Sequence, residues 1–158
     1  MGATDAELKA GMSSFSGVYR RFNIHVNTTK VAYVDDYAHH PTEIAATLGA
    51  AKDLNYNNVI AVFQPFTFSR TALLKDEFIN ALSIADKVIL TPIMGSREVN
   101  TYGISSEDIA KGLDNCYCVN SFDEAVSKIF EIANENDIVI TMGGGDVYKI
   151  AKIIANKQ

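Results

Sequence analysis

The stretch VAYVDDYAHHPTEI, residues 31–44, places acids and imidazoles between an apolar, strand-like run and a helical pattern. Pro41 suits the first turn of a helix, and it pushes His40 toward an extended conformation. In an open α/β sheet, ligands bind at the carboxyl ends of strands, because the loops there line a crevice and the next helix presents free N–H groups. The stretch therefore predicts a strand, a loop that carries a site, and a helix, in that order.

The rest of the chain continues this alternation. Strands are expected at residues 21–26, 30–34, 59–63, 88–90, 117–119 and 138–141, with a hairpin-like connection at 27–29. Helices are expected at residues 4–11, 44–51, 74–82, 104–113, 122–133 and 147–154. Strands that are apolar throughout, each followed by an amphipathic helix, are typical of a mostly parallel sheet. The sequence therefore predicts an α/β, Rossmann-like, doubly wound fold with helices on both faces of the sheet.

Composition narrows the class of protein. A chain of 158 residues that is 47% hydrophobic suits one compact domain with a short leader. The net charge of −5 argues against a nucleic-acid surface. No apolar run approaches the roughly 20 residues that span a bilayer, and no secretory pattern is visible, so the cytoplasm is the expected compartment. Cys116 and Cys118 are expected to be a reduced, structural pair, because no further metal ligand has a suitable spacing.

Four loops should meet at the carboxyl ends of the predicted strands. These loops are residues 35–42, 64–71, 92–103 and 142–146. Their charged members are Asp35, Asp36, His39, His40, Arg70, Arg97, Glu98 and Asp146. Polar side chains on four loops that are distant in sequence favour a binding crevice over a set of solvated loops.

Each candidate has a functional and a structural interpretation. Asp36 could accept hydrogen bonds from ribose hydroxyls, or it could cap the following helix. His39 and His40 could stack on a base, bind an anion, orient a substrate, or be purely structural. Arg70 could hold a carboxylate or phosphate through two parallel bonds, or lie on the surface beside neighbouring phenylalanines. The glycines of residues 142–146 could bring N–H groups to an oxyanion, or simply form a tight turn.

Several motifs of phosphate binding and nucleophilic catalysis are missing from the sequence. No G-K-[ST] phosphate loop occurs, and neither a G-x-S-x-G elbow nor a Cys/His nucleophile pair is visible.

A series of motifs resembles the C-terminal domain of the Mur ligases. The motifs are GVYRRF (17–22), DDYAHHPTE (35–43), FQP (63–65), SRT (69–71), RE (97–98), GISS (103–106) and TMGGGD (141–146). The resemblance runs in order from about residue 15 to the end of the chain, and the DDYAHHPTE string is its most specific part.

The resemblance implies an ATP-dependent carboxylate–amine ligase of peptidoglycan synthesis. It implies UDP-N-acetylmuramate and L-alanine as substrates, an acyl phosphate intermediate, and ATP and Mg²⁺ held mainly by a preceding central domain. Residues 1–14 would be the tail of that central ATPase domain, and residues 15–158 the C-terminal domain. The isolated chain would then have no ligase turnover.

Site residues follow from the resemblance by position. Arg21 resembles the arginine that reaches the ATP phosphates, and Asp36 resembles the acid that holds ribose. The loop with Arg70 resembles the segment that receives the amino acid and the reacting carboxylate, and His39, His40 and Arg97 are placed on the same substrate side. One departure is Phe66, where family members often have His, and it leaves the amino-acid pocket undefined.

Two other interpretations remain open at this stage. One is a related Mur-type ligase that adds a peptide to the same sugar. The other is a non-enzymatic α/β nucleotide-binding module, such as a receiver or a nucleotide sensor. A receiver needs a Lys after a late strand, whereas Thr91 and Thr141 close the later strands here.

Overall fold

The computed structural model describes residues 2–14, 18, 20–27 and 31–155. The strands are β1 (Asn23–Asn27), β2 (Val31–Asp36), β3 (Val59–Phe63), β4 (Lys87–Leu90), β5 (Cys116–Cys118) and β6 (Asp137–Met142). The helices are α1 (Asp5–Ser14), α2 (Pro41–Lys52), α3 (Phe68–Leu73), α4 (Lys75–Leu82), α5 (Ser106–Ala110), α6 (Phe122–Ile132) and α7 (Tyr148–Ala155). Strands and helices alternate from β2 onward, as the sequence predicts.

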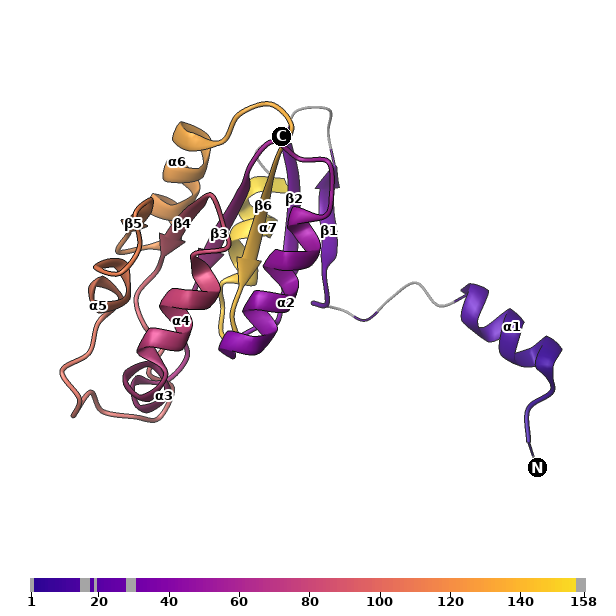
Figure 1. Cartoon of the computed structure of the whole chain (residues 1–158), viewed down its shortest axis with the longest axis horizontal. Helices are drawn as coiled ribbons and strands as arrows, with labels where there is room; N and C mark the ends of the chain where they lie inside the picture. The colour runs from indigo at the N-terminus through magenta and orange to yellow at the C-terminus, as the bar shows by residue number, and fades with distance from the viewer. Residues whose placement is uncertain (1, 15–17, 19, 28–30, 156–158) are drawn as a thin grey trace.

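The described strands form one six-stranded sheet in the order β1-β2-β6-β3-β4-β5 (Figure 1). β2, β6, β3, β4 and β5 are parallel to their neighbours, and β1 pairs antiparallel with β2. The predicted mostly parallel sheet is confirmed. β6 lies between β2 and β3 although it follows all the other strands in sequence.

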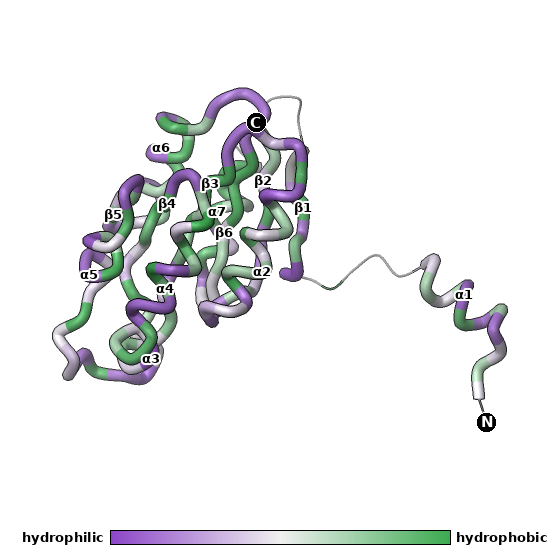
Figure 2. The backbone as a smooth tube through the Cα atoms, in the orientation of Figure 1, coloured by the Kyte–Doolittle hydropathy of each residue, from purple (hydrophilic) through white to green (hydrophobic). Residues whose placement is uncertain are grey.

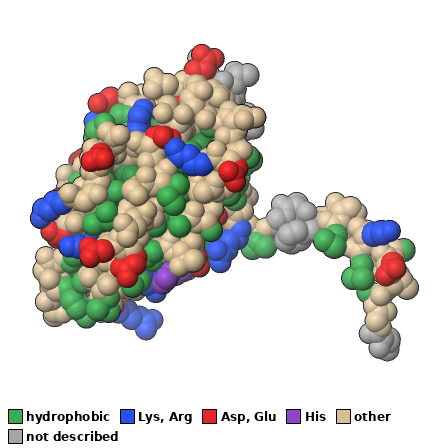
Figure 3. All heavy atoms as spheres, viewed as in Figure 1, with side chains coloured by type: hydrophobic (Ala, Val, Ile, Leu, Met, Phe, Trp, Pro, Cys, Tyr) green, Lys and Arg blue, Asp and Glu red, His purple; other side chains and the backbone are tan. Residues whose placement is uncertain are grey.

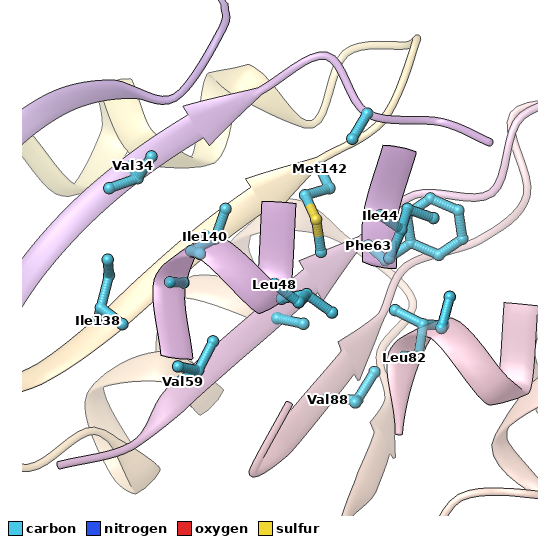
Figure 4. Packing of buried hydrophobic residues seen from close by; sticks show 14 of the residues in the cluster. Val34, Ile44, Leu48, Val59, Phe63, Leu82, Val88, Ile138, Ile140 and Met142 are labelled. Carbon is cyan, nitrogen blue, oxygen red and sulfur yellow. The ribbon is translucent and has the colours of Figure 1, made fainter. Parts of the chain in front are cut away.

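Helices cover both faces of the sheet, which confirms the doubly wound arrangement. Ile44 of α2 and Phe78 of α4 belong to the core cluster on one face, whereas Ile129 of α6 and Ile150 of α7 belong to the cluster on the other. Figure 4 shows the packing of the first cluster. Residues of β3 alternate between the two clusters, as the period-two geometry of a strand requires. Both faces of β3 are buried, and this strand consists of apolar residues only (Figure 2).

The predicted helix at residues 4–11 is longer than expected. Thr4 accepts a hydrogen bond from the Glu7 N–H, and the Glu7 carboxylate accepts one from the Thr4 N–H, which is a capping box. The predicted stop at Gly11 is wrong, because this glycine is not among those with a positive φ and α1 continues to Ser14. α1 buries no residue and lies away from the sheet (Figure 1).

Three further boundaries differ from the prediction. The helix expected at 74–82 is α4, which begins one residue later, and a separate helix, α3, precedes it because the backbone leaves the helical region at Leu74. In place of the helix expected at 104–113, the structure has only the shorter α5. The capping pair of Ser105 and Asp108 makes this helix begin later than expected. β5 begins one residue before the expected strand.

The first two strands are shifted toward the carboxyl end relative to the prediction. β2 continues to Asp36, because Asp35 and Asp36 stay paired with β6. β1 covers Asn23–Asn27, and residues 28 and 29 of the expected hairpin connection lie outside the described residues.

Among the described residues, no helix combines the length and apolar character needed to cross a membrane. Cys116 and Cys118 are both free thiols, in agreement with the expected reduced pair.

Candidate functional site

The carboxyl ends of the parallel strands lie in one row. Asp36 of β2 pairs with Met142 of β6, Met142 with Phe63 of β3, Phe63 with Leu90 of β4, and Leu90 with Cys118 of β5. The four predicted loops therefore leave the sheet at the same edge, the lower one in Figure 1. We call it the carboxyl edge.

The crevice at this edge lies beside β6. The helices that follow β2 and β3 pack on one face of the sheet, and α7, which follows β6, packs on the other. Loops that diverge toward opposite faces leave a gap between them, and ligands of open α/β sheets bind in such gaps.

Asp36 accepts hydrogen bonds from backbone N–H groups of two segments, one just before β1 and one just after β2. Its side chain is 6% exposed, Oδ2 accepts a hydrogen bond of 2.7 Å from the Phe22 N–H, and Oδ1 accepts one of 2.8 Å from the Ala38 N–H. The carboxylate therefore fixes the entry to β1 against the loop that follows β2. The alternative that Asp36 caps α2 is wrong, because another residue occupies the cap.

His40 is the N-cap of α2. Its Nδ1 accepts a 3.4 Å hydrogen bond from the Thr42 N–H, while Glu43 Oε2 accepts bonds from the N–H groups of His39 and His40. Nδ1 of His39 also lies 3.2 Å from Glu43 Oε2. Burial acts to raise the pKa of Glu43, but these N–H donors and the charge of His39 outweigh it and lower that pKa.

Arg20, which the sequence did not single out, has the most contacts of any cation at the edge. Its Nη2 donates to the Gly143 carbonyl at 2.7 Å, and its Nε donates to Asp35 at 3.3 Å. Its guanidinium lies 4.8 Å from the ring centroid of Tyr37 and 4.7 Å from that of Tyr148. The side chain thus links the end of β2, the turn after β6 and the start of α7.

Asp35 is the buried partner of this arginine. It is 1% exposed, and it accepts a 3.1 Å hydrogen bond from the Thr141 hydroxyl. Burial raises its pKa, although Arg20, Thr141 and His25 act in the opposite direction. The structure therefore gives Asp35 an internal role and keeps it away from ligands.

Arg21 is exposed, unlike its neighbour Arg20. Its guanidinium lies 5.8 Å from the ring centroid of Tyr37, and the His39 ring meets the same tyrosine edge-on at 5.1 Å. The structure therefore brings Arg21 and His39 together around one half-exposed aromatic ring.

The loops after β3 and β4 are paired with each other. The Thr67 N–H donates to the Met94 carbonyl, and the Met94 N–H donates to the Pro65 carbonyl, both at 2.9 Å. Farther along, the Ser69 hydroxyl and N–H both donate to the Glu98 carboxylate, at 2.6 and 2.8 Å. Residues 65–69 and 94–98, which we call the paired loops, therefore form one wall of the crevice.

Both predicted arginines of the substrate side lie on or beside the paired loops. Arg70 is in the first turn of α3, and its buried Nη1 has no hydrogen-bond partner among the described residues. Arg97 is exposed on the loop after β4, and Phe66 is half-buried. The structure gives no direct contact that would test a substrate role for either arginine.

The glycine-rich turn packs tightly on the paired loops. Gln64 Oε1 accepts a 2.9 Å hydrogen bond from the Asp146 N–H. A Cβ on Gly145 would overlap Met94 Sδ and Gln64 Oε1, and Gly143 has a φ of 151°. The positive φ of Gly143 favours glycine at that position, and a Cβ on Gly145 would require the ends of the Met94 and Gln64 side chains to move, whereas Gly144 has room for a Cβ.

A cavity of about 300 Å³ opens where the turn meets the paired loops. Ile93, Met94 and Phe122 give it apolar walls, and Gln64 and Asp146 supply polar groups. Its size and mixed lining suit a small polar molecule with a short apolar part.

Metal binding finds no support in the side chains. Among the described residues, no group of three or more His, Cys, Asp or Glu is arranged to hold a metal ion. His39 and His40 are accounted for by the contacts at the start of α2.

Comparisons with known proteins agree with the motif resemblance. Residues 20–145 match the family described as Mur ligase, glutamate ligase domain. Two curated relatives, each called UDP-N-acetylmuramate--L-alanine ligase, come from Lachnospira eligens and Acetivibrio thermocellus. They are 44% and 41% identical to this chain over 92% and 100% of its length, and the matched regions are 32% and 35% of those proteins.

A solved structure shows the same fold. The UDP-N-acetylmuramate-alanine ligase of Thermotoga maritima matches 96% of this chain and 33% of its own, with a TM-score of 0.77 and 27% identity. The chain therefore spans about a third of the length of the relatives that it matches.

Proposed function

Because this chain belongs to the Mur ligase family, we propose that it is the C-terminal domain of an ATP-dependent UDP-N-acetylmuramate:L-alanine ligase of peptidoglycan synthesis. The relatives that carry this name match nearly the whole chain, which supports the choice of substrates.

The observation that carries the proposal is the set of arginine and histidine side chains at the carboxyl edge. Five such side chains lie next to strand ends at this edge, although the net charge of the chain is −5. They are Arg21, which precedes β1, and His39, His40, Arg70 and Arg97, which follow β2, β3 and β4. Figure 3 shows histidine and basic side chains gathered at this edge. Both the nucleotide and the muramoyl carboxylate are anions, and cations at the crevice would lower the free energy of bringing them together.

The reaction joins a carboxylate to an amine. A carboxylate is a poor electrophile, so phosphoryl transfer from ATP would first make an acyl phosphate, and the amino group of L-alanine would displace phosphate from it. We assign Arg21 and Asp36 to the nucleotide side of the crevice. We assign His39, His40, Arg70 and Arg97 to the substrate side, where they would orient the two reacting groups and neutralise their charge.

The contacts of Asp36 and Arg21 fit these assignments. Each Asp36 oxygen accepts one backbone N–H, and a carboxylate oxygen has a second lone pair for a ribose hydroxyl. Arg21 is exposed beside the Tyr37 ring and has the reach to meet a phosphate.

The triphosphate and Mg²⁺ would be held by a preceding domain. The sequence has no phosphate loop, and the described side chains form no metal cluster. We therefore propose residues 1–14 as the tail of that domain and residues 15–158 as the C-terminal domain. Leu8 and Met12, which are 54% and 80% exposed and four positions apart on α1, would pack against it.

The test compares the 158-residue chain with a longer protein that includes the residues encoded before it. Phosphate release is measured with ATP, Mg²⁺, UDP-N-acetylmuramate and L-alanine, and with an L-Ala-containing tripeptide in place of L-alanine. Turnover should need the longer protein and should prefer L-alanine. Steady turnover by the 158-residue chain would contradict the proposal that a preceding domain holds ATP and Mg²⁺. A preference for the tripeptide would contradict the proposal that L-alanine is the substrate.

A further inference from the structure

We propose that Arg20 is a positioning residue that sets the orientation of the peptide between Gly143 and Gly144, and with it the N–H groups that the glycine-rich turn presents at the carboxyl edge. The effect on catalysis rests on the proposed function, whereas the effect on the turn does not.

The backbone of Arg20 is held in an unusual conformation. Its φ is 59°, a region that residues with a Cβ rarely adopt. Two hydrogen bonds of 2.8 Å maintain it: the Arg20 N–H donates to Asn23 Oδ1, and the Arg20 carbonyl accepts from the Tyr37 N–H. The Arg20 side chain therefore leaves the backbone in a fixed direction, into the domain rather than into solvent.

The guanidinium is fixed in its plane as well as in position. Tyr37 and Tyr148 lie at nearly equal distances from it, and the buried Asp35 accepts from Nε. Asp35 is in turn held by its bond from Thr141. Because the guanidinium is planar, these partners also fix the direction of Nη2, which points to the Gly143 carbonyl at 2.7 Å.

This bond determines which way the next N–H points. A trans peptide is planar, and its C=O and N–H groups point in opposite directions. With the Gly143 carbonyl bonded to Arg20, the Gly144 N–H must point away from the guanidinium. Glycine has little conformational preference of its own, so without Arg20 the peptide loses the side-chain contact that selects its orientation.

The turn is also where site residues meet. A Cβ built on Gly144 would lie 3.5 Å from the His39 ring, and one on Gly143 would lie 2.9 Å from the Gln64 carbonyl. The orientation that Arg20 sets is therefore transmitted to both the loop after β2 and the loop after β3.

The first test uses the 158-residue chain with its ten glycines labelled with ¹⁵N. Arg20→Lys keeps the charge but loses the planar fork, and it should move the amide resonances of Gly143 and Gly144 while those of the distant Gly49 and Gly112 stay in place. Lys152→Ala is the matched control, because Lys152 lies 5.0 Å from the same Tyr148 ring without touching the turn. Unmoved Gly143 and Gly144 resonances in Arg20→Lys would overturn the proposal.

The second test uses the longer ligase. Arg20→Ala should lower kcat/KM on the order of tenfold, the factor that about 1.4 kcal/mol produces. Millimolar guanidinium should restore part of this loss, whereas urea should not, and Lys152→Ala should behave as the wild type. A loss that follows only the unfolded fraction, without rescue, would overturn the positioning role. If Arg20→Lys fails to fold, Arg20→Gln, which keeps an N–H donor, takes its place in the resonance test.

The two tests separate the two proposals. If the glycine resonances respond to Arg20→Lys but the longer protein has no L-alanine ligase activity, the proposed function is refuted and the inference is supported. Ligase activity with wild-type kinetics in Arg20→Ala would refute the inference alone.

Discussion

Replacing Asp36 by Ala should destabilise the domain strongly, because two backbone N–H groups would lose their acceptor. The Ala38 N–H belongs to a fully buried residue, and Phe22 is half-buried. An unpaired buried donor costs about 1–3 kcal/mol, and water can reach the Phe22 side. We therefore expect the free energy of unfolding to fall by about 2–4 kcal/mol, a large part of the 5–15 kcal/mol that is usual for a domain.

Urea unfolding followed by far-UV circular dichroism measures this change, since the chain has no tryptophan. Asp53→Ala is the matched control: the same substitution at an exposed residue should change the free energy by about 0.5 kcal/mol or less. Asp36→Asn keeps one acceptor oxygen but turns an NH₂ group toward the other donor, so its loss should be intermediate. A change below about 0.5 kcal/mol in Asp36→Ala would refute the role of Asp36 in joining β1 to the loop after β2.

The same variant tests the nucleotide side of the site. In the longer ligase, below its unfolding temperature, Asp36→Ala should raise the KM for ATP more than the KM for L-alanine. An unchanged KM for ATP would remove Asp36 from the nucleotide site and leave it a structural role only.

Two further predictions concern the turn and the opposite end of the sheet. Gly143→Ala should cost about 1–3 kcal/mol in thermal or urea unfolding, because its φ of 151° is strained for Ala and the new Cβ would lie 2.9 Å from the Gln64 carbonyl; unchanged stability would show that the turn adapts. Burial acts to raise the pKa of Asp86, but the hydrogen bonds that it accepts from Lys52 and from the Val59 N–H lower this pKa below 3.8. The ionised Asp86 therefore contributes stability above pH 3.8, and this contribution is lost as the pH falls through the lowered pKa. Lys52→Met should make stability less dependent on pH in this acidic range, and identical pH profiles would contradict the pairing.

The strands were predictable where burial on both faces left a continuous apolar signal. Residues 59–63 were predicted with both ends correct, because polar residues flank five apolar ones. The order of the strands was not predictable, since the place of β6 depends on pairing between segments far apart in the chain. Gly11 misled the prediction because an exposed helix tolerates a glycine at a modest cost.

The site was predictable as an edge but not in its contacts. Parallel strands bring their carboxyl ends together, so four polar loops could be assigned to one crevice. Arg20 and Arg21 are adjacent and identical in type, and nothing in the sequence distinguishes the one whose side chain bonds to Asp35 and Gly143. His40 was left open as a ligand or a structural residue, because an imidazole is an uncommon helix cap.

The central place of β6 also determines how this domain can form during synthesis. The ribosome releases β2 and β3 long before β6, so each waits with one backbone edge unpaired until the residues between it and β6 have emerged. The bond from the Thr141 hydroxyl to the Val34 carbonyl spans 107 positions and can close only then. Folding is therefore slow relative to folds with local contacts, and nascent chains that stop before residue 137 expose pairing edges that chaperones must cover.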